Sequence, residues 1–176
     1  IEVVIKMVVG DDRARLSEAV RSVLAQCGIV IVTGGLGPTE DDVTRDAVAA
    51  AVGRAQHFRQ DIADAIEGRF RRMNRKMADI NLRQASLIED AEALPNPHGT
   101  APGQWIEHDG RVVVLLPGPP PEMMPMFTEH CAARLGSLLP PTVIRTRLLR
   151  VAGMTESDLD QLISPVGAER TFLLFF

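Results

Sequence analysis

An apolar run that ends in a glycine-rich stretch is the feature that most restricts what this chain can fold into. Ile29 to Val32 contains only β-branched residues, which is typical of a parallel strand that is buried on both faces of a sheet. Gly34 to Pro38 then ends the strand and leads into a predicted helix from about Val43 to Val52. A strand, a tight loop and a helix form the repeating unit of α/β domains.

The flanking segments continue this alternation. Glu2 to Val9 is another nearly unbroken β-branched run and predicts a strand, and Asp12 is the expected N-cap of the amphipathic helix that follows. Asp109-Gly110 lies between the apolar runs Trp105 to His108 and Arg111 to Leu116, a strong signal for a two-residue hairpin. We therefore predict a three-layer α/β/α fold with a mostly parallel sheet and an antiparallel hairpin strand.

Three further segments complete the predicted layout. Gln60 to Gln84 is charged and free of proline, so we expect a helix with a break near Met73 to Asp79. Leu94 to Gly103 holds three prolines and two glycines and must be irregular. A last helix is expected from Glu122 to Leu135.

The size and charge of the chain limit its class. With 176 residues it is expected to form one domain at residues 1–140 and the start of a small second domain or linker at residues 141–176, with Arg170 to Phe176 as a strand of the latter. The net charge of −4 argues against a nucleic-acid partner. No apolar run approaches the roughly 18 residues of a membrane span, so no membrane partner is expected. Cys27 and Cys131 are too few for a disulfide framework, and we expect a cytoplasmic protein.

Acidic residues follow the glycines of the first loop. Glu40, Asp41 and Asp42 would repel a phosphate held by the loop amides unless a divalent cation lay between them. Alternatively, Asp42 caps the helix by accepting a hydrogen bond from the amide of Thr44 or Arg45. The loop is not a Walker A motif, and Glu40 stands where the third glycine of a dinucleotide-binding fingerprint should be.

Basic residues and histidines outside the first loop are further candidates for a site. The basic run from Arg69 to Lys76 could bind a phosphate or a partner chain, or it could be a solvated helix face. His98 lies in the irregular loop and could contact a ligand. The four histidines lie on different predicted elements, without the spacing of a zinc site.

Four motifs in order resemble one known family. The pattern T-G-G-x-G-P-x-x-x-D-x-T over Thr33 to Thr44 resembles the signature of the MoaB/Mog molybdopterin-binding fold, and Leu36 at its variable position is similar to the CinA branch. The segments Met77 to Ala85, Asn96 to Gly103 and Leu116 to Met123 also match that family. The resemblance covers roughly residues 1–163.

The resemblance implies a metal-dependent nucleotide pyrophosphatase that acts on ADP-ribose-like substrates. It places Asp42 and Asp11 in catalysis, and Asp42, Asp11 and Asp41 as ligands of a divalent metal ion (Mg, Mn or Co), with a monovalent cation as a further cofactor. It also implies the following nucleotide- or pterin-binding residues: Gly34, Gly35, Gly37, Thr39, Thr44, Asn96, Gly99, Thr100, Pro117 and Gly118.

Two alternatives to this function stay open. One is a molybdopterin-binding or adenylyltransferase-type protein of molybdenum-cofactor biosynthesis, and the other is a non-catalytic binding fragment. The expected partner is a nucleotide or pterin small molecule, and a homo-oligomer, preferably a dimer, is expected. Family members begin with a strand and helix that do not precede Ile1 here, and a missing strand would leave an exposed sheet edge.

Overall fold

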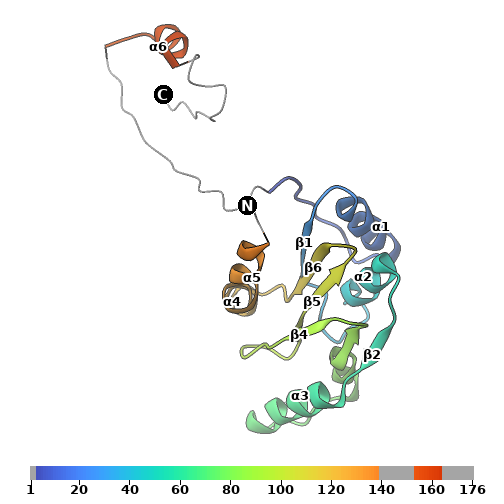
Figure 1. The fold of residues 1–176 in the computed structure, drawn as a ribbon. Coiled ribbons are helices and arrows are strands. Elements are labelled where there is room, and N and C mark those ends of the chain that lie inside the picture. The colour runs from blue at the N-terminus through green and yellow to red at the C-terminus, as the bar shows by residue number, and fades with distance from the viewer. Residues whose placement is uncertain (1–2, 139–152, 164–176) are drawn as a thin grey trace. The chain divides into compact units, whose positions relative to one another are not determined.

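A computed structural model describes residues 3–138 and 153–163 (Figure 1). The chain divides into two compact units, Ile1–Pro140 and Pro141–Phe176, at the residue that the sequence analysis proposes as a domain boundary. The described part of the second unit is one helix, α6 (Glu156–Ile163), and the strand predicted over Arg170 to Phe176 lies outside the described residues. No helix in the described ranges combines the length and the apolar character that a membrane crossing needs.

In the first half of the first unit helices and strands alternate, and four consecutive strands then precede the last helical segment. Its elements, in chain order, are α1 (Arg13–Leu24), β1 (Ile29–Thr33), α2 (Thr44–Val52), β2 (Gln56–Phe58), α3 (Gln60–Arg72), the 3-10 helix η1 (Asp79–Ala85), β3 (Ser86–Ile88), β4 (Glu92–Leu94), β5 (Gly103–His108), β6 (Arg111–Leu116), α4 (Pro120–Met126), the π-helical turn η2 (Phe127–Cys131) and α5 (Ala132–Ser137).

The central sheet has the strand order β1-β6-β5-β4. β1 and β6 are parallel, and β5 is antiparallel to both of its neighbours, so three of the four strands run in the same direction. The β5–β6 hairpin turns at Asp109 and Gly110, whose φ angles of 49° and 72° are both left-handed, as a type I′ turn requires. The predicted α/β fold and its antiparallel hairpin strand are confirmed.

Helices cover both faces of this sheet. Val113 and Leu115 of β6 pack against α1 and α2, whereas Val112 and Val114 pack against the helical segment from α4 to α5. This alternation follows the two-residue period of a strand. Figure 1 shows the two helical layers on opposite sides of the sheet, which confirms the predicted three layers.

The ends of the helices follow from local sequence. Asp12 caps α1 as predicted, by accepting a hydrogen bond from Arg15 N at 2.8 Å. The segment from Pro120 to Ser137 is helical throughout, close to the predicted Glu122 to Leu135. Pro125 lies inside it and has no amide hydrogen to donate, and the π turn η2 follows directly.

Two predictions about strands are wrong. Val3 to Gly10 forms no strand, and Val3 and Val8 are 77% and 96% exposed, because this segment has no strand partner among the described residues and β-branched side chains alone do not form a sheet. β1 is not buried on both faces: among the described strands it lies at the edge of the sheet and pairs only with β6, and Ile31 is 43% exposed.

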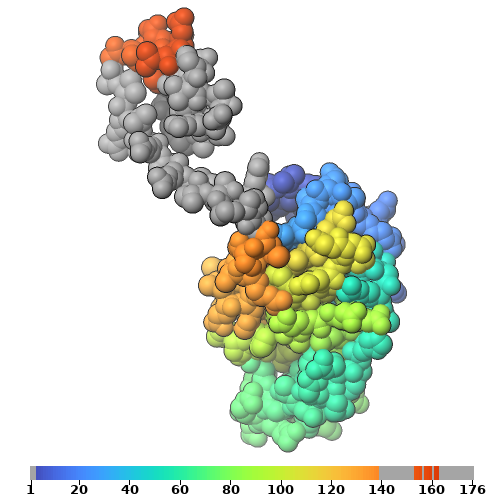
Figure 2. Space-filling view, viewed as in Figure 1, coloured from blue at the N-terminus to red at the C-terminus, as the bar shows by residue number. Residues whose placement is uncertain are grey.

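A smaller sheet was not foreseen. β2 and β3 form an antiparallel pair, beside which α3 and η1 pack through Ala63, Ile66 and Ala85. Gln104 of β5 joins this small unit to the central sheet: its Oε1 accepts from Ile88 N at 2.9 Å, and its Nε2 donates to Ser86 O at 3.2 Å. In Figure 2 the residues of α3 form the lower end of the first unit.

Gly103 tests this packing. A Cβ atom at this position would lie 2.6 Å from Met126 Sδ and 2.7 Å from Leu115 O, so Gly103→Ala should lower the free energy of unfolding by about 1–3 kcal/mol through overpacking. Urea denaturation measures this change. Gly28→Ala is the control, because its Cβ would meet nothing within 4 Å; equal losses in the two variants would contradict the packing described above.

Candidate functional site

Two glycine-containing loops meet at one end of the central sheet. We call Thr33 to Thr44 the first loop and Leu116 to Pro120 the second loop; they follow the parallel strands β1 and β6. Gly34 N donates to Leu116 O at 3.0 Å, and a Cβ on Gly118 would lie only 3.3 Å from Gly34 Cα. The two backbones approach so closely because neither residue has a side chain.

A pocket of about 420 Å³ lies against both loops. The third loop, Asn96 to Gly103, also borders it, so the structure brings together the three segments that the sequence analysis assigned to one site. The predicted residues that line the pocket are Gly34, Gly35, Gly37, Asp42, Gly99, Thr100, Pro117 and Gly118. Three predicted residues do not line the pocket and instead form hydrogen bonds that hold its loops, as described below: Thr39, Thr44 and Asn96.

Thr44 supports the first loop from beneath. Its amide donates to Gly35 O at 3.2 Å, and its side chain is buried. A Cβ on Gly35 would overlap the Thr44 hydroxyl, and the φ of 65° at Gly35 is left-handed. Glycine at this position is therefore required both by space and by backbone conformation.

A buried arginine fixes the same loop. The Arg45 guanidinium donates to Leu36 O and, at 3.0 Å, to Gly37 O, and the residue is only 4% exposed. Burial lowers the pKa of Arg45, which the charges of Asp46 and Asp42 partly counteract; an arginine stays protonated all the same. These hydrogen bonds pair both carbonyl oxygens with a side chain that does not line the pocket.

Asp42 lines the pocket and does not cap α2. The N-cap of α2 is Val43, without a side-chain hydrogen bond, so the capping alternative is wrong. Instead Asp42 Oδ2 accepts from Thr39 N at 2.9 Å and from Thr39 Oγ1 at 2.6 Å. Partial burial acts to raise the pKa of Asp42, but the hydrogen bonds from Thr39 and Gly37 and the charge of Arg45 lower it overall.

The three predicted metal ligands do not come together. Within residues 3–138 and 153–163, no group of three histidine, cysteine, aspartate or glutamate side chains is arranged to hold a metal ion. Asp11 and Asp41 are exposed and do not line the pocket. Asp11 precedes α1, in a segment that pairs with no described strand, so nothing directs its carboxylate toward Asp42.

Asn96 organises the third loop. Its Oδ1 accepts from Gly99 N at 2.8 Å, and its Nδ2 donates to Ala101 O at 2.8 Å and to Glu122 Oε2 at 2.7 Å. A Cβ on Gly99 would collide with the Glu122 carboxylate. Asn96 thus shapes the loop, and Glu122 of α4 contributes a second carboxylate to the pocket besides Asp42.

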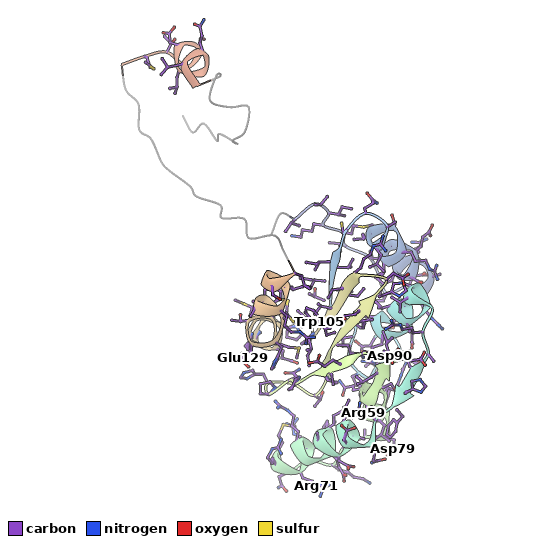
Figure 3. The ribbon with its side chains drawn as sticks, viewed as in Figure 1. Arg59, Arg71, Asp79, Asp90, Trp105 and Glu129 are labelled. Atoms are coloured by element: carbon purple, nitrogen blue, oxygen red, sulfur yellow. The ribbon has the colours of Figure 1, made fainter. Side chains whose placement is uncertain are left out.

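Arg69 of α3 connects the basic run to the pocket. It lines the pocket and donates to Pro97 O and His98 O, both at 2.6 Å. Arg71 instead forms an exposed ion pair with Glu67 at 3.0 Å, near the outer end of α3 in Figure 3. The two interpretations of this run therefore apply to different residues: Arg69 belongs to the site, and Arg71 lies on the solvated face.

Two polar residues of the pocket were not predicted from the sequence. Gln84 and Glu122 both line it, although each stands inside a motif that the sequence analysis matched. His98, for which the sequence offers ligand contact as an interpretation, also lines the pocket. The signal that could have found Glu122 is its place directly after the second loop, whereas Gln84 is adjacent to no glycine loop in the sequence and is brought to the pocket by the fold.

Known proteins are similar to this chain in sequence and in fold. A family model described as "Probable molybdopterin binding domain" matches residues 1–137. A CinA-like protein of Solibacter usitatus is 56% identical over 166 residues, covering 94% of this chain and 40% of that protein, and one of Koribacter versatilis is 44% identical over 170 residues, covering 94% and 41%. The chain thus spans about two-fifths of the length of these curated relatives. The crystal structure of the protein CinA from Thermoplasma acidophilum, titled as of unknown function, aligns with a TM-score of 0.63 at 28% identity and covers 74% of each chain.

The hydrogen bonds to Asp42 predict a pH dependence. A carboxylate whose folded pKa lies below its ordinary value of 3.8 adds stability above that value, and this stability is lost as the pH falls through the folded pKa. Wild type should therefore exceed Asp42→Asn in free energy of unfolding by a constant amount from about pH 5 to 8, and the difference should shrink below about pH 4. Urea denaturation at several pH values measures it. A Thr39→Val background, which lacks one donor, should weaken the effect; a difference that persists unchanged to low pH would contradict the assignment.

The contacts of Arg69 predict its effect on the third loop. Arg69→Met removes two hydrogen bonds to loop carbonyls, so amide hydrogen exchange around Gly99 should become about fivefold faster or more. Arg71→Met on the same helix is the matched control and should leave these amides unchanged. Equal protection in both variants would show that the third loop does not depend on α3.

Proposed function

This chain belongs to the family of CinA-like proteins with a probable molybdopterin binding domain, and we propose that it is a metal-dependent nucleotide pyrophosphatase acting on ADP-ribose-like substrates. The observation that carries the proposal is that two closely packed glycine loops and two carboxylates, Asp42 and Glu122, border the same pocket. Glycine loops suit a diphosphate, and carboxylates suit the cation that accompanies it.

The loops supply the phosphate contacts in this proposal. Without side chains at Gly35 and Gly118, a phosphate oxygen can approach the backbone of both loops closely, whereas the Gly34 amide is already bonded to Leu116 O. Arg69 adds a positive charge at the same pocket. The volume of about 420 Å³ lies within the range of small-molecule sites.

The carboxylates supply the cation contacts. Magnesium is commonly bound by one or two carboxylates together with substrate phosphates and water, so it needs no cluster of three protein ligands. We therefore assign this role to Asp42 and Glu122 in place of Asp11 and Asp41. A divalent ion (Mg, Mn or Co) bound there would polarise the phosphoryl oxygens of the substrate. A monovalent cation is a separate proposal, which exchange of potassium for sodium would test.

The lowered pKa and the hydrogen bonds of Asp42 suit a residue that binds a cation better than a residue that accepts a proton. Hydrogen bonds from Thr39 hold its carboxylate in place, and a pKa below the ordinary value keeps it ionised at neutral pH. A general base works best when its pKa lies near the operating pH. In the proposal Asp42 orients the cation and the diphosphate, and it takes no proton.

A pterin ligand is the second candidate. It is favoured by the family model, whose description names a molybdopterin binding domain over residues 1–137. The same glycine loops could hold the phosphate of a pterin.

Two further parts of the proposal concern location and assembly. We propose a cytoplasmic location, in keeping with the free thiols of Cys27 and Cys131, which cell fractionation would test. We also propose a homodimer, which size-exclusion chromatography would test.

Hydrolysis of ADP-ribose tests the proposed function. Purified chain with Mg²⁺, Mn²⁺ or Co²⁺ should release AMP and ribose 5-phosphate, and a chelator should abolish the reaction. Asp42→Asn and Glu122→Gln should each lower kcat/KM by about 100-fold or more, because each removes a charge from the cation site.

Glu40→Gln is the matched control for the carboxylate variants. Glu40 belongs to the same loop but pairs with Arg83 at 2.9 Å and does not line the pocket, so its loss should change kcat/KM less than about threefold. Activity that survives both Asp42→Asn and Glu122→Gln would refute the cation site. Binding of a pterin without any hydrolysis of ADP-ribose would favour the second candidate.

A further inference from the structure

Gln84 is a buried polar residue in the wall of the pocket. It lies in η1, is only 2% exposed, and its Oε1 has no hydrogen-bond partner within the part of the chain that the structure describes. Buried amide oxygens are normally paired, because leaving one unpaired costs the hydrogen bond that it had with water. An unpaired acceptor in a pocket wall is in a position to be paired by a ligand.

Two comparisons within the same domain separate Gln84 from other buried polar residues. Gln104 is also fully buried, but both ends of its amide are bonded, to Ile88 N and Ser86 O. Ser17 has a buried hydroxyl without a partner in the described ranges, but it lies in α1 and does not line the pocket. Among the residues that the structure describes, only Gln84 combines an unpaired buried oxygen with a place in the pocket wall.

The position of Gln84 is fixed by its neighbour. Arg83 Nη1 donates to Thr39 O at 3.2 Å and to Glu40 Oε1 at 2.9 Å, which ties η1 to the first loop. The backbone at Gln84 is therefore held beside the loop assigned to phosphate. The terminal amide torsion of a glutamine is broad, so Oε1 can turn toward a ligand without moving the backbone.

We propose that Gln84 is a specificity-determining residue whose amide oxygen accepts a hydrogen bond from a hydroxyl or N–H group in the non-phosphate part of the bound nucleotide. This rests on the proposed function, because it takes the glycine loops to hold the diphosphate. A ligand that fills the phosphate site but lacks such a donor leaves Gln84 Oε1 unpaired and binds less tightly. A polar group that is left unpaired in this way discriminates strongly between ligands.

Replacement by methionine provides the test, because methionine has nearly the shape of glutamine without its polar atoms. Without ligand, Gln84→Met should raise the Tm of the full chain by about 2 °C or more, since an unpaired buried oxygen is removed. Gln104→Met is the matched control. It should lower the Tm, because Ile88 N and Ser86 O each lose the hydrogen bond that they form with the Gln104 amide. A fall in Tm for Gln84→Met would show that its amide has a structural partner and would overturn the inference.

Calorimetric titration gives the second readout, with the α,β-methylene analogue of ADP-ribose, pyrophosphate and ribose 5-phosphate as probes. Gln84→Met should weaken binding of the analogue by about tenfold or more and leave pyrophosphate unchanged. A matching loss for ribose 5-phosphate places the donor on the terminal ribose; no such loss places it on the adenosine half.

The outcomes separate this inference from the proposed function. Equal affinity of wild type and Gln84→Met for the analogue, or an equal loss for pyrophosphate, overturns the role of Gln84 while hydrolysis of ADP-ribose by the wild type still stands. A wild-type chain that binds pyrophosphate but neither binds the analogue nor hydrolyses ADP-ribose overturns the proposed function, and the role of Gln84 with it.

Discussion

The parallel pairing of β1 with β6 is the constraint on which the rest of the site depends. Parallel strands end at the same edge of a sheet, so the loops that follow Thr33 and Leu116 must leave the sheet side by side. Their backbones can then touch only if both loops have glycine at the point of contact, as Gly34 and Gly118 do. The pairing of β1 with β6, the glycines of the two loops and the pocket beside them therefore depend on one another. A change in the register of β1 against β6 would disrupt all three.

Much of this arrangement could be predicted from sequence because the deciding signals are local. A left-handed Asp-Gly turn, an Asp N-cap and a β-branched run before a glycine loop each act over a few residues. That the three loops form one site was implied by the family resemblance of the four motifs. The short strands β2, β3 and β4 escaped prediction because three residues carry too little periodicity to be recognised.

Side-chain roles depend on distant contacts and were harder to foresee. Whether Asp42 caps α2 or bonds to Thr39 is decided by the path of the first loop, which sequence spacing does not show. The expected strand Glu2 to Val9 has the right residues but no described partner. Burial of Arg45 against two loop carbonyls likewise appears only once the loop is folded.

Two parts of the first unit contribute to the site in different ways. The central sheet contributes mostly backbone, through the glycines that follow β1 and β6, whereas the small unit of α3 and η1 contributes the side chains of Arg69 and Gln84. Backbone amides recognise a phosphate whatever is attached to it. If the proposed function holds, exchange of side chains on α3 and η1 would change which ligand the pocket accepts without disturbing the core, so relatives could diverge in substrate while keeping the same sheet.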